Sequence, residues 1–566
     1  MSKCYKNVKN RHGILLFMND LIVGLLTRRG IFDPLEQEEF LNPDYKKLHD
    51  PFLMNDLENA CVRIFQAIEN KEKIAIYGDY DCDGIPGSVV LLELFKKIGY
   101  EHVVVYIPDR HLEGYGLNNE SINALSSQCV QLLVTVDLGI SNAPEVAHAC
   151  SLGMEVIVTD HHEPPEHVPT GALLVHPKIG SYPDPNLAGA GVAFKIVQGF
   201  LKKYGDYFSV TEGWEKWLLD LVGFATLSDM VPLRGENRIL SFFGMHVLRR
   251  NNRVSFQEIF RELAINPRDA TEDDIYFSIA PRLNAASRME SPRIAFDLLA
   301  TDDQIEARML ASRLGKINDE RKSLVAHIMK DVHSTLEKRD DKPVIVIGNP
   351  GWRVGVLGLI ASRIVDTYAR PAFVWGREGS EVIKGSTRSD GTIHVVELMH
   401  RTKDVFLEYG GHEGAGGFSI SPESIHILEE RLCAEHIPNG KESGKQVCVD
   451  AEIKLSDVSY SFYESIQRLA PFGAENPKPV FSFSHVTVTD VHQFGKEKNH
   501  VEVTFSSGNK TIKGIKFFAS ASNFSHVPVV GDSVVCIGCV ELSTFRGRRE
   551  LRLRIEDITS SEETNQ

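Results

Sequence analysis

The stretch KIAIYGDYDCDG, residues 73–84, joins a short apolar run to three alternating aspartates and a closing glycine. Three further apolar runs follow the same plan, each with an aspartate after it and helical patterns in between: HVVVYIP (102–108), QLLVTV (131–136) and EVIVT (155–159). Strands that alternate with helices predict right-handed βαβ units and a parallel sheet. We therefore expect an α/β domain with a carboxylate at the end of each strand, at the edge where such sheets bind ligands.

The rest of the chain predicts three further parts. Residues 303–340 have helical periodicity and a single glycine, which indicates a long connecting helix. The segments KPVIVIG, GVLGLIASRIVDTY and PAFVWG predict a second α/β unit, and five short alternating segments after residue 445 predict a β-barrel of the OB-fold type. The expected domains are an N-terminal extension (1–50), the parallel-sheet domain (51–302), the connecting helix (303–340), the second α/β domain (341–440), the barrel (445–560) and a disordered tail (561–566).

Composition narrows the class of protein. The 566 residues carry a formal net charge of −15, which argues against a protein that packages nucleic acid with a basic surface. Nine scattered cysteines argue against a disulfide framework and favour a cytoplasmic protein. Cys536 and Cys539 form one C-x-x-C pair without a second, so we interpret them as strand packing rather than a zinc site. No uncharged apolar stretch is long enough to cross a membrane.

The aspartates of GDYDCDG are the first candidates for a cation-binding site. Asp79, Asp81 and Asp83 alternate, so an extended backbone presents all three on one side. Carboxylates held together raise one another's pKa, and bound cations would neutralise them. The same spacing also fits a solvated acidic turn or a calcium loop.

Further candidate ligands follow other apolar segments, namely Asp137, Asp160, His161, His162 and Asp229. Each has an alternative interpretation as a turn aspartate or a hydrogen-bonded core histidine. A set rich in carboxylates with one imidazole favours manganese or magnesium over zinc. Five carboxylates exceed the need of one ion and fit two ions about 3.5–4 Å apart that share a bridging carboxylate.

The motifs GDYDCDG, VTVDLGIS, VTDHHE and SDMVPL resemble those of the DHH phosphoesterase superfamily, and GGHEGAGGF resembles the glycine-rich signature of the DHH-associated domain. In order along nearly the whole chain, further segments resemble the RecJ family: IPDRHLEGYGLN, LAGAGVAFK, APRLNAASRM, GWRVGVLGLIASRI, IKGSTRS and APFGAENPKPVF. The resemblance implies a 5′→3′ exonuclease specific for single-stranded DNA. Such enzymes use manganese or magnesium, and their OB-fold closes a ring around the strand.

The same resemblance implies a cellular setting. It implies release of 5′-mononucleotides during DNA recombination and repair, by a monomer that does not bind membranes. Its implied partners are single-stranded DNA with a 5′ end, a RecQ-type helicase and a single-strand-binding protein.

Carried over motif by motif, the resemblance assigns roles to the metal-site residues. It implies that one ion is held by Asp79, Asp81 and Asp137. It implies that the second is held by Asp83, Asp137, His161 and Asp229, with Asp137 bridging. His162 would contact the scissile phosphate, and Asp160 would orient its histidine neighbours.

The resemblance also implies DNA contacts. Arg110, Ser386 and Arg388 match positions that grip the 5′-terminal phosphate. The strand's path would be lined by Arg282 and Asn284. His412 is a phosphate contact or a turn histidine. Arg546, Arg548 and Arg549 either bind the DNA backbone beside Phe545 or form a charged edge strand.

Four positions depart from the family pattern: Leu138 stands where asparagine is usual, Ser287 where glycine is common, and Glu413 and Gly414 where small or apolar residues are frequent. None of these departures removes a proposed ligand. Leu138 could change the hydrogen bonding around the ligands, and Glu413 could change how its loop meets a phosphate.

Two alternative functions use the same fold. A non-catalytic scaffold that binds single strands would have an eroded ligand set, whereas all six proposed metal ligands are present. A DHH phosphodiesterase for very short oligoribonucleotides or cyclic dinucleotides would lack the C-terminal barrel, whereas residues 445–560 predict one.

Overall fold

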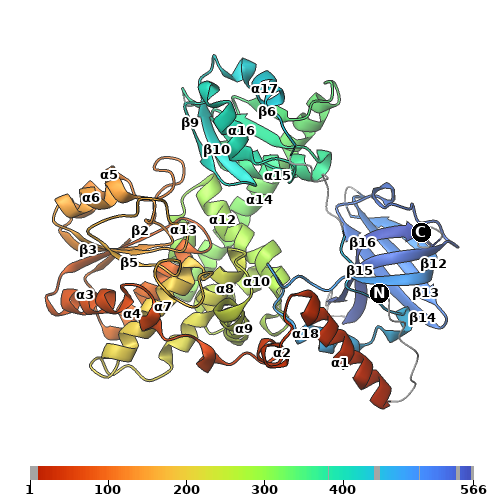
Figure 1. Ribbon diagram of the computed structural model, residues 1–566, viewed down its shortest axis with the longest axis horizontal. Helices are drawn as coiled ribbons and strands as arrows, with labels where there is room; N and C mark the ends of the chain where they lie inside the picture. The colour runs from red at the N-terminus through yellow and green to blue at the C-terminus, as the bar shows by residue number, and fades with distance from the viewer. Residues whose placement is uncertain (1–10, 380, 439–446, 496–497, 544–548, 562–566) are drawn as a thin grey trace. The chain divides into compact units, whose positions relative to one another are not determined.

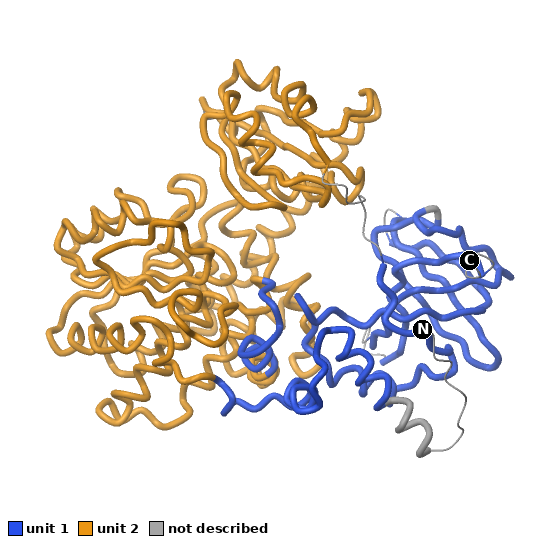
Figure 2. The backbone as a smooth tube through the Cα atoms, viewed as in Figure 1, with its two compact units in different colours: residues 1–48, 230–242, 446–566 blue, residues 49–229, 243–445 orange. Residues whose placement is uncertain are grey.

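The computed structural model describes residues 11–379, 381–438, 447–495, 498–543 and 549–561. It divides into two compact units, coloured separately in Figure 2. One unit comprises residues 49–229 and 243–445, and the other comprises residues 1–48, 230–242 and 446–566. None of the described helices combines the length and the apolar composition needed to cross a bilayer.

The larger unit begins with a five-stranded parallel sheet in the order β2-β1-β3-β4-β5 (Figure 1). Its strands are β1 (Lys73–Gly78), β2 (Val103–Tyr106), β3 (Val130–Val136), β4 (Glu155–Thr159) and β5 (Leu173–Val175). The helices around it are α3 (Leu57–Glu69), α4 (Gly84–Ile98), α5 (Asn119–Ser127), α6 (Ala143–Ser151), α7 (Gly189–Tyr204) and α8 (Leu219–Ser228). The expected parallel α/β domain is confirmed.

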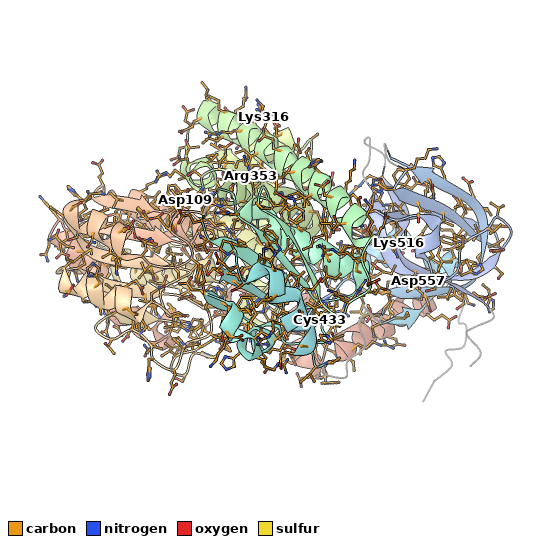
Figure 3. The ribbon with its side chains drawn as sticks, turned by 90° about the horizontal axis from the view of Figure 1, so that it is seen from above. Asp109, Lys316, Arg353, Cys433, Lys516 and Asp557 are labelled. Carbon is orange, nitrogen blue, oxygen red and sulfur yellow. The ribbon has the colours of Figure 1, made fainter. Side chains whose placement is uncertain are left out.

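The expectation that all four strands end at a site carboxylate is wrong for Asp109. Strand β2 ends at Tyr106, so Asp109 lies three residues beyond it in a loop (Figure 3). There its Oδ1 accepts hydrogen bonds from the backbone N–H groups of His111, at 2.8 Å, and Leu112, at 3.2 Å. Asp109 therefore stabilises a turn, because its carboxylate accepts hydrogen bonds from backbone N–H groups of its own loop.

A helical region follows the parallel sheet. It comprises α9 (Gly235–Arg250), α10 (Val254–Glu262), α11 (Glu272–Asp274), the π-helix η5 (Ile275–Ile279), α12 (Ala280–Met289) and α13 (Arg293–Ala300). The predicted long helix is α14 (Gln304–Leu336). Asp303 caps its N-terminus by accepting a hydrogen bond from the Glu306 N–H, which explains why the helix starts there.

The second α/β domain has a mixed sheet in the order β6-β7-β8-β10-β9. Its strands are β6 (Ile345–Asn349), β7 (Ala372–Gly376), β8 (Ile383–Arg388), β9 (Glu408–Gly411) and β10 (Ala415–Ile420), with helices α15 (Leu357–Tyr368), α16 (Val395–Arg401) and α17 (Ile425–Ala434). One apolar cluster packs α14 and α15 against β6 and β7, and a second packs α16 and α17. The sheet is therefore covered by apolar side chains from both groups of helices.

The smaller unit contains a closed barrel of five strands: β12 (Phe481–Phe494), β13 (His500–Ser507), β14 (Lys510–Phe517), β15 (Ser533–Ser543) and β16 (Glu550–Ser560). The order is β12-β13-β14-β16-β15, and pairing of β12 with β15 closes it. Cys536 and Cys539 are free and buried on β15. Ile22 and Leu26 of α1 (Arg11–Arg28) and Phe40 of α2 (Pro34–Leu41) join the same apolar core.

Candidate active site

Three aspartates meet at one edge of the parallel sheet. Asp79, Asp137 and Asp160 directly follow β1, β3 and β4, which are neighbours or next neighbours in the sheet. Asp229 reaches the same place as the C-cap of α8. Each of the first three side chains is at most 4% exposed. The carboxylates therefore converge because parallel strands end at a common edge.

The start of α7 positions Asp83 and Asp137. The N–H groups of Gly189 and Ala190 donate to the Asp83 carboxylate at 2.6 and 2.8 Å, so a helix N-terminus holds this anion. A Cβ atom on Gly189 would lie 2.7 Å from the Asp137 Cβ. Glycine at position 189 therefore allows α7 to approach the site closely enough to bind Asp83.

The predicted ligands form three groups in which the ligand atoms lie within 4.8 Å of one another. These groups are Asp79 with Asp81 and Asp137, Asp83 with His161 and Asp229, and Asp137 with His161 and His162. The His161 Nε2 lies 3.1 Å from the Asp137 Oδ1. Asp137 thus belongs to groups on both sides of the site, which is the position that a bridging ligand needs.

Unsatisfied atoms show which way the ligands face. The Oδ1 atoms of Asp79 and Asp137 and the Nε2 of His161 are buried and have no hydrogen-bond partner. Burying such atoms without partners costs free energy, so they are expected to have a partner of another kind. Oxygen and imidazole-nitrogen donors that point into one small space fit divalent cations such as manganese or magnesium.

The pKa shifts of the aspartates also support a site for cations. Burial, followed by repulsion from neighbouring carboxylates, raises the pKa of Asp79 and Asp137 well above the ordinary value. The same two causes raise the pKa of Asp83 to about 7 and that of Asp229 to about 9. The cluster therefore holds more negative charge than its surroundings stabilise, and cations would neutralise it.

The pKa values of the two adjacent histidines are shifted in opposite directions. Burial lowers the pKa of His161 to about 3, so this imidazole is neutral and able to act as a ligand. Burial alone would lower the pKa of His162 as well, but a 2.8 Å hydrogen bond with Asp160 outweighs it and raises that pKa. Burial opposes ionisation of Asp160, yet the bond with His162 prevails and lowers its pKa to about 2. The Asp160 carboxylate thus favours the protonated form of the His162 imidazole.

A further residue at the site, which the sequence analysis missed, is Tyr115. Its hydroxyl lies 3.2 Å from the Nδ1 of His162 and donates to the Asp137 carbonyl at 3.3 Å. The motif IPDRHLEGYGLN contains this tyrosine, but nothing in its pattern indicates that the loop turns back toward β3.

The residues assigned to a 5′ phosphate gather at a basic group beside the metal ligands. Arg388 Nη1 donates to the Ser386 hydroxyl at 3.1 Å, and the Arg110 guanidinium lies 5.0 Å above the Tyr80 ring. A Cβ atom on Gly358, in the first turn of α15, would lie 3.0 Å from Arg388 Nη2. Glycine at position 358 therefore lets the Arg388 guanidinium and the Ser386 hydroxyl approach the first turn of α15.

Arg288 of α12 is a second residue that the sequence analysis missed. Burial, then Arg110, Arg321 and Arg388, lower its pKa to about 9. Arginines that repel one another in a buried setting need an anion to stabilise them. The motif APRLNAASRM contains Arg288, but only the fold brings it to arginines more than thirty residues away.

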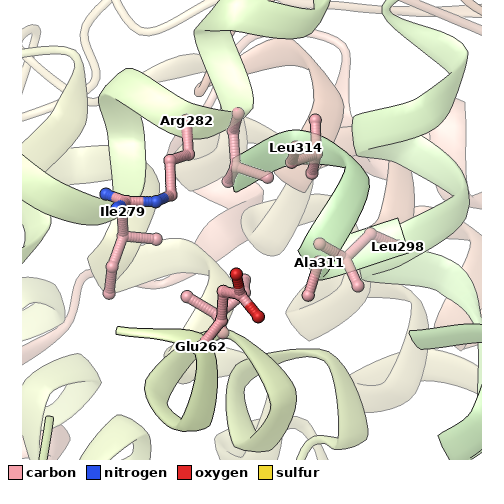
Figure 4. Close-up of a pocket in the computed structure, with 8 residues that line it drawn as sticks. Glu262, Ile279, Arg282, Leu298, Ala311 and Leu314 are labelled. Atoms are coloured by element: carbon pink, nitrogen blue, oxygen red, sulfur yellow. The ribbon is translucent and has the colours of Figure 1, made fainter. Parts of the chain in front are cut away.

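The residues assigned to the strand's path lie on α12. Arg282 is half-buried at the edge of a small pocket lined by Ile279, Glu262 and Leu314 (Figure 4), and its Nη1 donates to the Ser278 carbonyl at 2.7 Å. Its Nε is buried without a partner. On the same helix, Asn284 is half-buried, and its backbone lies beside the Cys82 thiol.

The glycine-rich loop places His412 at the exposed turn between β9 and β10. Its Nδ1 accepts a hydrogen bond from the Gly414 N–H at 3.3 Å. The Glu413 carbonyl accepts from the Val395 N–H at 3.0 Å, so this departure from the family pattern caps α16 through its backbone. The adjoining residue of β10, Ala415, pairs with Arg388, so the loop adjoins the basic group.

Leu138 directly follows the proposed ligand Asp137 in the chain, but its side chain belongs to an apolar cluster. Its side chain is fully buried in the apolar cluster between the sheet and α5 and α6. Its carbonyl accepts a 2.7 Å hydrogen bond from Thr135 Oγ1.

In the barrel, Arg549 is exposed just before β16, and its carbonyl accepts a hydrogen bond from the Tyr460 hydroxyl. Arg546 and Arg548 lie outside the described residues.

The fold and site define a phosphoesterase of the DHH class. Residues 73–226 match the model of the DHH family N-terminal domain, and residues 341–434 match the DHHA1 domain. Residues 449–557 match the RecJ OB domain.

Relatives narrow the class further. The chain is 34% identical over 554 residues to the single-stranded-DNA-specific exonuclease RecJ of Bacillus subtilis, covering 97% of this chain and 69% of that protein. It is 29% identical to RecJ of Escherichia coli, covering 89% and 90%. The chain belongs to the RecJ family of single-stranded-DNA-specific exonucleases.

Solved structures share the fold. The crystal structure of Thermus thermophilus RecJ in complex with Mn²⁺ superposes with a TM-score of 0.79 at 24% identity, covering 97% of this chain and 77% of that chain. A crystal structure of exonuclease RecJ bound to manganese is 31% identical, with a TM-score of 0.60, covering 67% of this chain and 94% of that chain. The fold class expected from the sequence is confirmed.

Proposed function

We propose that this RecJ-family exonuclease removes 5′-mononucleotides from single-stranded DNA by hydrolysis at a site that holds two divalent cations. The observation that carries the proposal is the set of three ligand groups, two of which share Asp137, together with three buried ligand atoms that have no hydrogen-bond partner. In this assignment Asp79, Asp81 and Asp137 hold one ion, and Asp83, Asp137, His161 and Asp229 hold the other. Manganese or magnesium bound there would lower the pKa of a water and stabilise charge on the phosphate oxygens.

The chain's own residues supply the remaining chemistry. His162, held by Asp160, would donate a hydrogen bond to an oxygen of the scissile phosphate, and its raised pKa favours the protonated form that this role needs. The Tyr115 hydroxyl also lies 3.2 Å from the Nδ1 of His162 and helps to restrain the ring. His161 stays neutral, so its Nε2 lone pair remains available to an ion.

The position of the basic group supports degradation from the 5′ end of the strand. Arg110, Ser386, Arg388 and Arg288 would hold the 5′-terminal phosphate, because burial and then the nearby Arg110 lower the pKa of both Arg288 and Arg388, and Arg388 contacts the Ser386 hydroxyl. A terminal phosphate fixed next to the metal site would place the first internal phosphodiester at the ions. The product would then be a mononucleotide.

The test is a long single strand with a 5′ phosphate and a label at either end, incubated with manganese, magnesium or a chelator. We expect mononucleotides from the 5′ end that disappear with chelator or with a duplexed 5′ terminus. Degradation from the 3′ end would overturn the polarity and the roles of Arg110 and Arg388. Tight binding without turnover would identify a non-catalytic scaffold, and a preference for dinucleotides would identify a small-substrate phosphodiesterase.

Arg288 provides a separate prediction. Arg288→Met should raise KM for a strand with a 5′ phosphate by roughly 10- to 150-fold, because a charged hydrogen bond contributes about 1.5–3 kcal/mol. KM for a strand with a 5′ hydroxyl should hardly change. The matched control is Arg293→Met, which removes an exposed arginine that is paired with Asp297. Equal losses on both strands would show that Arg288 is only structural.

We further propose that Arg282, Asn284 and His412 contact the strand and that Arg549, Arg546 and Arg548 bind its backbone. A role in recombination and repair, with a RecQ-type helicase and a single-strand-binding protein as partners, fits an enzyme that needs a free 5′ single strand. Pull-down of each partner by the full chain would test these interactions.

A further inference from the structure

A buried histidine follows the last strand of the parallel sheet. His176 comes directly after β5, and its side chain is fully buried. Strand β5 pairs in parallel with β4, so the loop that begins at His176 adjoins the loop that carries His161 and His162. None of the roles assigned above to the site residues uses His176.

Both ring nitrogens of His176 have backbone partners. Its Nε2 lies 2.9 Å from the carbonyl oxygen of His162, and its Nδ1 lies 3.1 Å from the backbone nitrogen of Lys178. A backbone N–H group can only donate, so Nδ1 accepts, and a neutral imidazole then carries its proton on Nε2. Burial lowers the pKa of His176, which favours the neutral form. His176 therefore donates to the His162 carbonyl.

The backbone of His162 is held on both sides. Its N–H group donates to Asp160 Oδ1 at 3.1 Å, and its carbonyl accepts from His176. The Asp160 carboxylate is itself held by the backbone N–H group of Ile140, at 3.0 Å. A residue whose N–H and C=O groups are both bonded has little freedom to turn its side chain away. The bond from His176 therefore restrains the imidazole that we assign to the scissile phosphate.

Two other links join the same loops, and neither replaces this bond. Lys178 Nζ lies 2.7 Å from Glu163 Oε1, but the Glu163 side chain is 85% exposed, and exposed ion pairs contribute little because water and salt screen them. The Asp160 N–H donates to the Val175 carbonyl at 3.4 Å, which only continues the pairing of the strands. Of these three links, the bond from His176 is the one that acts on His162 directly.

We propose that His176 is a positioning residue for the exonuclease reaction, which holds the His162 carbonyl so that the His162 imidazole meets the scissile phosphate. The inference rests on the proposed function, because it assigns His176 to the same reaction. A displacement of about 1 Å in a reacting group can cost roughly 100-fold in rate. In this proposal His176 touches neither the strand nor the ions, so the binding of both should be independent of it.

The test is the rate of 5′ nucleotide release by the full chain with manganese. His176→Leu removes the donor, and we expect kcat to fall roughly 10- to 100-fold, as when a partner that orients a site residue is lost. KM and manganese affinity should hardly change. His176→Gln keeps a donor at its Nε2 and should recover most of the rate. The matched control is His333→Leu, which removes a half-buried histidine bonded to the Tyr368 hydroxyl and should leave kcat unchanged.

A double-mutant cycle tests whether His176 acts through His162. If it does, His176→Leu should lower the rate little further in a His162→Ala background, because the group that it positions is already gone. Losses that multiply in the double variant would overturn the proposal. So would an unchanged kcat in His176→Leu, or a loss of manganese affinity equal to its loss of rate.

A measurement without turnover separates this proposal from the exonuclease proposal. In wild-type protein labelled with nitrogen-15 histidine, the ring nitrogen shifts report the tautomer of each imidazole in chelator. We expect His176 to carry its proton on Nε2, and a proton on Nδ1 would overturn the positioning role even if the strand is cut. A protein with the Nε2 tautomer that cuts no strand would overturn the exonuclease proposal, and the positioning role would fall with it. Because this measurement uses the wild type, it holds even if His176→Leu does not fold.

Discussion

Asp137→Ala should lower the exonuclease rate by ~10³-fold or more, in the range found when an enzyme loses electrostatic stabilisation of its transition state. Asp137 shares ligand groups with Asp79 and Asp81 on one side and with His161 on the other. Losing it disturbs both proposed ions at once, which no loss of a single hydrogen bond would do. The measurement is the initial rate of 5′ nucleotide release with manganese.

The unfolding temperature distinguishes a variant that has lost catalysis from a variant that has lost its fold. Burial and repulsion raise the pKa of Asp137, so its charge destabilises the ion-free protein at neutral pH. The ion-free variant should therefore unfold at no lower temperature than the wild type. Glu163→Ala is the matched control, since this exposed carboxylate of the same segment only pairs with Lys178. An Asp137→Ala protein with more than a tenth of the wild-type rate would contradict the bridging role.

The second large effect is the pH dependence of ion binding. Ions bind the ionised carboxylates, so protons compete with them as pH falls through the raised pKa values of Asp83, about 7, and Asp229, about 9. Manganese affinity should fall on the order of 10²–10³-fold from pH 8 to pH 6, because roughly one proton or more is displaced per ion bound. Titration calorimetry in two buffers of different ionisation enthalpy measures both the affinity and the proton release.

The same raised pKa values determine how the stability of the folded protein changes with pH. A carboxylate whose folded pKa is raised costs stability as pH rises above its unfolded value, about 4. Ion-free protein should therefore lose stability as pH rises from 5 to 8, while manganese at 100 times its Kd should restore about 2.7 kcal/mol. In Asp229→Asn, the slope of the logarithm of manganese affinity against pH should fall by about one, because the ion displaces about one proton fewer. Affinity that is constant between pH 6 and pH 8 would rule out this linkage.

Much of the molecule could be predicted without coordinates, for local reasons. Apolar runs that end before Asp79, Asp137 and Asp160 predict both the strands and their carboxylates, because a buried parallel strand must be apolar and its end must be polar. The helical period of α14 and the alternation in the five barrel strands are equally local signals. In these segments side-chain burial and backbone pattern agree, so the sequence alone determined the order of domains and the candidate metal ligands.

Only the tertiary structure decided which residues meet across long separations. Asp109 has the same local pattern as the other aspartates, yet β2 ends early and the carboxylate caps its own loop. Tyr115 reaches His162, and Arg288 reaches Arg110 and Arg388, through contacts that no periodicity records. The physical reason is that strand ends, helix starts and loop paths are fixed by packing against distant segments, whereas a sequence pattern reports only on neighbours along the chain.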